Sequence, residues 1–187
     1  MTHNLYKLGM VIGRFQVLHN GHVTMVRRAL DLCDVVVVYI GSSQEARTKV
    51  NPFSYEERRE MFAEVFTLEI ACGRLIVRPL PDIGVGNNED WGAYVLDTFK
   101  KEFHSLPDLY VTGCEKVRSS WFTNEIAPNT DELRMTRHNI EVSGTSCRSV
   151  LRANDYTKWC ESVPLELFTK FTEYKDILNL VEETTYE

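Results

Sequence analysis

The sequence feature that most constrains the fold is the segment over residues 9–40, which has the pattern of a strand, a helix and a second strand. Residues 9–13 form an apolar run, and apolar residues then recur at helical spacing from Val23 to Cys33. Residues 35–40 are apolar without polar alternation, as a central parallel strand buried on both faces requires. The segment therefore predicts an α/β fold built on a mostly parallel sheet.

The turn between the first strand and the helix is unusually polar. Gly13 and Arg14 end the strand, while His19 and His22 are spaced to lie on the same side of the first helical turn. A helix start presents free backbone N–H groups and the positive end of the helix dipole, and both favour an anion. One cap would suffice for packing, so three polar side chains indicate a further role. We predict a site for a polyphosphate whose charge rises during reaction.

These residues carry a family resemblance. Gly-Arg-Phe-Gln at 13–16 with His-Asn-Gly-His at 19–22 resembles the signature of the His-x-Gly-His nucleotidyltransferase superfamily. The longer pattern resembles the nicotinamide mononucleotide adenylyltransferases, in particular the archaeal-type branch and the related domain fused to Nudix hydrolases. This chain shows no Nudix signature, and Val17 stands where the family usually has proline. The resemblance implies one Rossmann-like domain, with a core over about residues 5–153, a C-terminal helical segment over 154–180 and a frayed tail to 187.

Composition agrees with a domain that acts on small molecules. The 187 residues with 43% apolar content suffice for one α/β domain with a hydrophobic core. The net charge of −6 argues against a nucleic-acid surface. The five cysteines show no C-x-x-C pair and predict reduced thiols without structural zinc. Neither a signal peptide nor a membrane-spanning run is apparent, so we expect a cytoplasmic protein and leave open a homo-oligomer.

The second strand also ends in glycine and hydroxyl residues, at 41–43, and adjacent strand ends of this kind define one cleft. A polar loop with Arg47 and Lys49 follows, and Ser54 with Glu57 forms the pattern of a capping box. The resemblance makes this the mononucleotide-side loop. The archaeal form has its arginine where this chain has Val50, whereas Arg47 matches the Nudix-fused branch. Which of the two basic residues meets a phosphate, or whether both are simply solvated, stays open.

The loop over residues 80–88 leads into a helical apolar stripe that begins with Trp91. On spacing alone Trp91 belongs to the core, although a tryptophan at a helix start can also stack on a flat ring. The resemblance favours the second role, with Trp91 stacking on nicotinamide and Asn88 hydrogen-bonding to it.

Two later segments complete the predicted site. A strand over 109–113 precedes Lys116, Arg118 and two serines followed by an aromatic residue, as in the Nudix-fused branch, with Val117 where aspartate is usual. A strand over 139–142 precedes Ser-Gly-Thr-x-x-Arg at 143–148, which resembles the superfamily's second, ATP-phosphate-contacting signature. Ser143 or Thr145 would cap the helix, and an anion would offset the unfavourable position of Arg148.

The resemblance implies transfer of AMP from ATP to nicotinamide mononucleotide, giving NAD and pyrophosphate by direct in-line attack. Mg²⁺ would be bound by substrate phosphates, and no protein metal ligand is predicted. The alternatives are adenylylation of nicotinate mononucleotide, phosphopantetheine or FMN, or a non-catalytic module that senses NAD or ATP. The implied catalytic residues are His19, His22, Arg14 and Arg148; the ATP site comprises Gly13, Arg14, Phe15, His19, His22, Gly113, Lys116, Arg118, Ser143, Thr145 and Arg148, and the mononucleotide site Gln16, Ser43, Arg47, Asn51, Asn88 and Trp91.

Overall fold

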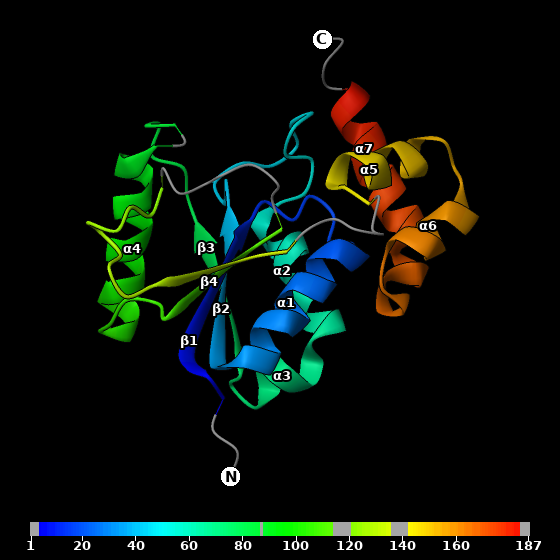
Figure 1. Cartoon of the computed structure of the whole chain (residues 1–187). Coiled ribbons are helices and arrows are strands. Elements are labelled where there is room, and N and C mark those ends of the chain that lie inside the picture. The colour runs from blue at the N-terminus through cyan, green and yellow to red at the C-terminus, as the bar shows by residue number, and fades with distance from the viewer. Residues whose placement is uncertain (1–3, 87, 114–120, 136–141, 184–187) are drawn as a thin grey trace.

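The computed structural model describes residues 4–86, 88–113, 121–135 and 142–183 (Figure 1). Within them, five strands form one sheet in the order β3-β2-β1-β4-β5, and every neighbouring pair is parallel. The predicted parallel α/β fold is therefore confirmed. The strands are β1 (Tyr6–Gly13), β2 (Cys33–Gly41), β3 (Leu75–Leu80), β4 (Leu109–Thr112) and β5 (Asp131–Arg134).

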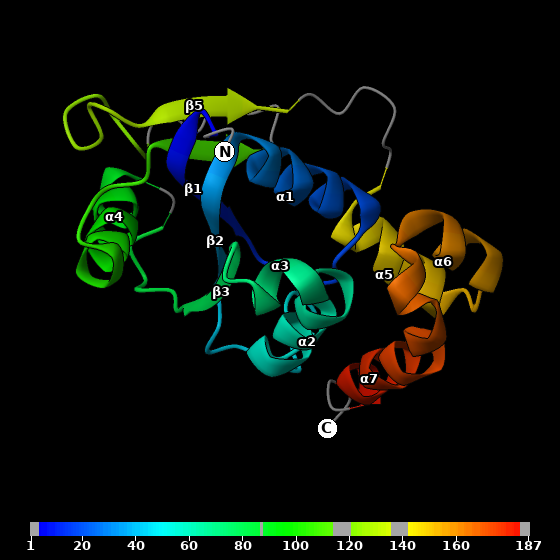
Figure 2. The ribbon, with the colours of Figure 1, turned by 90° about the horizontal axis from the view of Figure 1, so that it is seen from below.

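Helices cover both faces of this sheet. Figure 2 shows α4 on one side and α1, α2 and α3 on the other, with the C-terminal helices grouped beyond α1 and α2. These helices are α1 (Asn20–Leu32), α2 (Tyr55–Val65), α3 (Thr67–Ala71), α4 (Glu89–Phe103), α5 (Gly144–Arg152), α6 (Tyr156–Ser162), the 3-10 helix η1 (Leu165–Lys170) and α7 (Phe171–Glu183). The helical segment expected over residues 154–180 is thus divided among α6, η1 and α7.

The central strands are buried on both faces, as their unbroken apolar runs predict. Successive side chains of a strand point to opposite faces, and Val36 and Val38 of β2 belong to the core cluster that also contains α1 and α2 residues. Val37 and Tyr39 of the same strand belong to the second cluster, with residues of α4. Polar groups of β1 and β2 can therefore face a ligand only at the strand ends.

The edge strand β5 differs from the expectation. The strand expected over 139–142 falls largely on residues outside the described part, and Val142, which is described, lies outside any strand. The strand that pairs with β4 is Asp131–Arg134, with Leu109 opposite Asp131. Its sequence, Asp-Glu-Leu-Arg, is mostly exposed. Charged residues are typical of an edge strand, and they hide such a strand from apolar pattern recognition.

Arg74, which directly precedes β3, fixes the end of the sheet at which the parallel strands begin. Helix α1 has no basic residue in its last turn. The Arg74 guanidinium donates to the carbonyl oxygens of Leu30, Cys33 and Asp34, so it caps the end of α1 and the start of β2 together.

Two further findings concern the whole described chain. None of its helices combines the length and apolar character needed to cross a membrane. Cys33, Cys72, Cys147 and Cys160 are free thiols, and burial raises the pKa of Cys33 and Cys147 to about 12. Such thiols stay protonated and unreactive at neutral pH.

The capping box predicted at the start of α2 is confirmed. Ser54 accepts a hydrogen bond from the backbone N–H of Glu57, and the Glu57 carboxylate accepts one from the backbone N–H of Ser54. We expect Ser54→Ala to lower the free energy of unfolding in urea by about 1 kcal/mol, because the backbone N–H of Glu57 loses the side-chain oxygen to which it donates. The control is Ser149→Ala, an exposed helical serine in α5 whose loss should be close to neutral. Equal effects of the two substitutions would contradict this account of the cap.

Candidate active site

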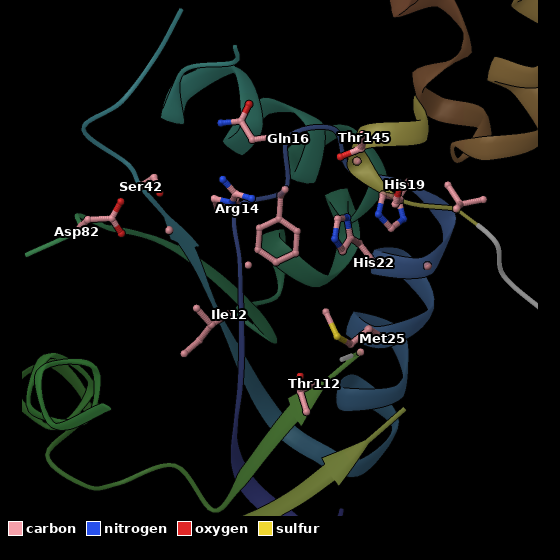
Figure 3. A pocket seen from close by; sticks show the side chains of 18 of the residues that line it. Ile12, Arg14, Gln16, His19, His22, Met25, Ser42, Asp82, Thr112 and Thr145 are labelled. Carbon is pink, nitrogen blue, oxygen red and sulfur yellow. The ribbon is translucent and has the colours of Figure 1, made fainter. Parts of the chain in front are cut away.

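A cavity of about 790 Å³ opens at the carboxyl edge of the sheet, within the size range of small-molecule sites. The register places Gly13 beside Ile40 and Gly41 beside Leu80, so the ends of β1, β2 and β3 meet there. The carboxyl end of β4 and the start of α5 complete the wall. Figure 3 shows Asp82 and Ser42 on one side of this cavity, with His19, His22 and Thr145 on the other.

The turn after β1 depends on a strained residue. Phe15 has a φ of 48°, in the left-handed region that a non-glycine residue rarely adopts. Its ring is buried against Phe62 and His22, at centroid distances of 5.0 and 4.8 Å. A Cβ at Gly13 would lie 2.9 Å from the same ring, so this close approach requires glycine. The folded turn thereby sets the position of His22 through the ring beneath it.

The two histidines lie together, as their spacing predicts. Their ring centroids are 3.6 Å apart with an interplanar angle of 22°, and both side chains line the cavity. His19 is the residue before α1, and His22 lies on its first turn, where the dipole is positive. His19 is buried and His22 half-buried, so an anion that contacted their ring edges would be partly shielded from water.

The start of α5 closes the cavity from the other side. Ser143 caps this helix by accepting from the N–H of Ser146 at 3.0 Å. Arg148, on the first turn, donates to the carbonyl of Gln16 at 2.6 Å and to the Thr145 hydroxyl at 3.3 Å. The late signature and the β1–α1 turn, 132 residues apart in sequence, are therefore in contact. This is the juxtaposition that the two motifs predicted.

The cavity is electropositive. Arg14 and Arg148 line it, and burial together with the neighbouring cations Arg152 and Arg14 lowers the pKa of Arg148. Asp82 supplies the one carboxylate among the described residues that line the wall. Two guanidinium groups, two imidazoles and two helix N-termini converge there, which suits an anion with several charges.

The opposite lobe of the cavity is aromatic. Trp91 and Trp121 both line it, with ring centroids 4.3 Å apart and an interplanar angle of 54°. Trp91 is 8% exposed and belongs to the core cluster beside α4, as its spacing predicts, and its stacking on a ligand stays a prediction. Trp121 is absent from the predicted site. The signal that could have found it is the aromatic residue after two serines in the segment that resembles the Nudix-fused branch.

Four residues predicted for the mononucleotide side are not placed on the cavity wall: Ser43, Arg47, Asn51 and Asn88. The Arg47 guanidinium makes a two-pronged ion pair with Glu57, at 2.7 and 2.6 Å. The Asn51 amide donates to Glu45. Asn88 caps α4, since its side chain accepts from the N–H of Trp91 at 3.1 Å. The side chains of Arg47, Asn51 and Asn88 are therefore already engaged in contacts within the protein.

The remaining predicted residues either line the cavity or lie outside the described part of the chain. Gly13, Phe15, Gly113, Ser143 and Thr145 line the cavity as expected. Gln16 also lines it, yet its buried side-chain amide both donates to and accepts from the backbone of Phe53, at 3.1 and 2.9 Å, and so ties the loop before α2 to the β1–α1 turn. Lys116 and Arg118 lie outside the described residues.

The described side chains offer no ready-made metal cage. Among residues 4–86, 88–113, 121–135 and 142–183, no group of three or more histidine, cysteine or acidic residues could hold an ion. A divalent ion at this site would be held through the oxygens of a bound polyphosphate, as Mg²⁺ commonly is.

Comparison with known proteins agrees with the geometry. The family model described as cytidylyltransferase-like matches residues 10–150. The nicotinamide-nucleotide adenylyltransferase of Pyrococcus abyssi is 35% identical over 172 residues, covering 92% of this chain and 86% of that protein. The protein of the same name from Saccharolobus solfataricus is 29% identical over 89% of this chain and 91% of its own length. This chain therefore belongs to the cytidylyltransferase-like family and, within it, to the nicotinamide-nucleotide adenylyltransferases.

Solved structures show the same fold. A bifunctional NMN adenylyltransferase/ADP ribose pyrophosphatase from Francisella tularensis, complexed with AMP and a manganese ion, superposes with a TM-score of 0.72 at 23% identity. The match covers 97% of this chain but 53% of that chain, so this protein spans about half of the bifunctional one. The Plasmodium falciparum nicotinic acid mononucleotide adenylyltransferase gives a TM-score of 0.59 at 12% identity, over 95% and 98% of the two chains.

The aromatic lobe depends on a glycine within α4. A Cβ at Gly92 would lie 1.6 Å from the carbonyl oxygen of Trp121, so the two backbones approach too closely for any other residue. Alanine normally favours a helix over glycine by up to about 1 kcal/mol. We nevertheless expect Gly92→Ala to lower the free energy of unfolding by about 1 to 3 kcal/mol, through overpacking, and to change the tryptophan fluorescence.

The neighbouring position supplies the matched control. Ala93 is exposed on the same turn of α4, and Ala93→Gly should cost about 1 kcal/mol through helix propensity alone, with unchanged tryptophan fluorescence. Stabilisation by Gly92→Ala would contradict the close approach of Trp121.

Proposed function

We propose that this protein transfers the adenylyl group of ATP to nicotinamide mononucleotide, giving NAD and pyrophosphate. The observation that carries the proposal is the convergence of His19, His22 and Arg148 on one cavity from two helix starts. The archaeal relatives that match nearly the whole chain bear the name of this activity.

In this proposal the triphosphate of ATP lies between the two helix starts. His19 and His22 contact the phosphates and the charge that develops on them, while Arg14 and Arg148 bind the β and γ groups. Backbone or hydroxyl donors come from further residues on the wall. That set is Gly13, Phe15, Gly113, Ser143 and Thr145, and Lys116 and Arg118 are proposed as additional phosphate contacts.

The chemistry needs no protein base. The phosphate of the mononucleotide is already ionised at neutral pH, and one of its oxygens attacks the α-phosphorus of ATP. The bond from that phosphorus to the bridging oxygen breaks, and pyrophosphate leaves with the electron pair. Catalysis then consists of aligning the two phosphates in line and stabilising the leaving group. This agrees with a wall rich in cations and poor in carboxylates.

A divalent metal ion belongs to this proposal, and Mg²⁺ is the ion that we infer. It would neutralise part of the triphosphate charge while bound to phosphate oxygens and water. The Francisella relative was solved with a manganese ion and AMP, which supports divalent metal use in the family. The hydrogen-bond donors and cations of the cavity wall would then bind the phosphate oxygens that the metal ion does not hold.

The mononucleotide is proposed to occupy the aromatic lobe. Trp91 would stack on the nicotinamide ring. Asn88 would contact that ring only if its side chain gave up the hydrogen bond from the Trp91 N–H that caps α4. Arg47 would bind the phosphate only if its ion pair with Glu57 opened. Lys49 is the alternative cation. Gln16, Ser43 and Asn51 complete the proposed set, in part by holding the loop before α2.

Three broader expectations stay proposals. We place the reaction in the cytoplasm, with ATP and the mononucleotide as partners, and leave the oligomeric state to measurement. The division into a core over about residues 5–153 and a C-terminal helical segment over 154–180 is likewise proposed.

The direct test supplies ATP and Mg²⁺ with one mononucleotide at a time and monitors dinucleotide and pyrophosphate. We expect NAD from nicotinamide mononucleotide, and the nicotinate, flavin and phosphopantetheine substrates measure the selectivity of the aromatic lobe. Binding of ATP without pyrophosphate release from any substrate would contradict the enzymatic proposal and favour a sensing module.

The role of His22 gives a second test. We expect His22→Ala to lower kcat by about two to three powers of ten with nearly unchanged affinity for NAD, because one preorganised donor to the developing charge is lost. The control is His104→Asn, an exposed histidine at the end of α4 with a φ of 58°, a conformation that asparagine tolerates. Its kcat should equal that of the wild type. An unchanged kcat for His22→Ala would remove His22 from the mechanism.

A further inference from the structure

Arg58, on α2, is fully buried at 0% exposure, which is unusual for a cation. Its guanidinium donates to four main-chain carbonyl oxygens. The acceptors are Ser54 at 3.0 Å, Arg14 at 2.8 Å, Gly41 at 2.8 Å and Ser42 at 3.1 Å. One side chain therefore joins the start of α2 to the ends of both β1 and β2, directly beneath the cavity.

This arrangement is costly for the fold. Burial of the guanidinium, with Arg14 nearby, lowers the pKa of Arg58 to about 10, so the group still carries its charge at neutral pH. The four hydrogen bonds are made to neutral carbonyls, which compensate a buried charge less well than a carboxylate would. An apolar side chain would remove the buried charge but would leave these four carbonyl oxygens without their donor. The hydrogen bonds of this charged group therefore hold the main chain at the ends of β1 and β2, where Arg14, Gly41 and Ser42 line the cavity.

The acceptors show what that role is. The Arg14 carbonyl belongs to the peptide unit that precedes Phe15, and the Gly41 carbonyl belongs to the unit that precedes Ser42. Phe15 and Ser42 are both left-handed, each with a φ of 48°, and such conformations persist only where surrounding contacts hold them. Arg58 thus fixes the orientation of the peptide unit on the N-terminal side of each strained residue.

The planarity of the peptide bond gives the consequence. In a trans peptide the N–H points away from the C=O, and the structure contains no cis peptide among its described residues. Because the two carbonyls point to Arg58, the N–H groups of Phe15 and Ser42 point away from it. Phe15 and Ser42 both line the cavity, one from each strand end.

We propose that Arg58 is a positioning residue that holds the Phe15 and Ser42 N–H groups in place for substrate phosphate oxygens and adds a buried positive charge beneath them. The proposal rests on the proposed function for the identity of the phosphates, but its structural content is the presentation of two N–H donors to a polyphosphate. Donors fixed before the ligand arrives need no reorganisation, which is why such positions are effective.

The test compares Arg58→Lys and Arg58→Gln with the wild type, using inorganic triphosphate as the probe in titration calorimetry. Lysine keeps the charge but cannot span four carbonyls from one nitrogen, and glutamine removes the charge as well. We expect triphosphate to bind about 10- to 100-fold more weakly to the lysine variant, and more weakly still to the glutamine variant. Binding within twofold of the wild type by both folded variants would overturn the proposal.

Arg74→Lys is the matched control, since Arg74 also donates to three main-chain carbonyls but lies at the opposite end of the sheet. It should lower stability against urea while leaving triphosphate affinity and turnover unchanged. A purely structural role for Arg58 predicts the same pattern for Arg58→Lys. If the Arg74 variant loses affinity as strongly as the Arg58 variants do, the effect is a general loss of packing and the proposal fails.

A measurement on the wild type covers the case in which the Arg58 variants do not fold. In ¹⁵N-labelled protein, triphosphate should shift the amide resonances of Phe15 and Ser42, whereas the amide of Leu68, on the remote helix α3, should not move. Unmoved Phe15 and Ser42 amides, or a wild type that binds no triphosphate, would overturn the proposal. These readouts need no turnover, so a wild type that makes no dinucleotide contradicts the proposed function without deciding the role of Arg58.

Discussion

The structure depends on the parallel pairing of β1 with β2, two strands that are apolar on both faces. The pairing runs from Tyr6 beside Cys33 to Gly13 beside Ile40. With helices on both faces, most polar backbone groups in the middle of these strands are used in the sheet. The chain can direct free N–H groups and cations to a ligand only where the strands end, and the polar residues Arg14 and Ser42 follow the two strand ends directly.

Much of this could be predicted from sequence because the determining interactions are local or periodic. The apolar runs at β1 and β2 fix the sheet, and the spacing of His19 and His22 fixes their shared side of α1. The Ser143 cap and Arg148 define a second helix start by local rules. Two helix starts at the carboxyl edge of one sheet must then meet, and the contact of Arg148 with Gln16 is the result.

The features that could not be predicted depend on contacts distant in sequence. Nothing local to Gly92 indicates that the Trp121 carbonyl rests against it. The Arg47 guanidinium can bind either a carboxylate or a phosphate, and sequence spacing does not decide between them. In the structure it pairs with Glu57. β5 escaped prediction because an exposed edge strand needs no apolar pattern.

The charge distribution links the fold to the chemistry. The chain carries a net charge of −6, yet the described cavity wall gathers two arginines and two histidines against one carboxylate, and Arg58 lies below it. A reaction that needed a general base would require a carboxylate or a free imidazole placed at the nucleophile. A transfer between two phosphates requires instead that like charges be brought together, and the cost of that approach is electrostatic. Concentrating positive charge at the strand tips of an otherwise acidic protein offsets that cost where the two anions meet.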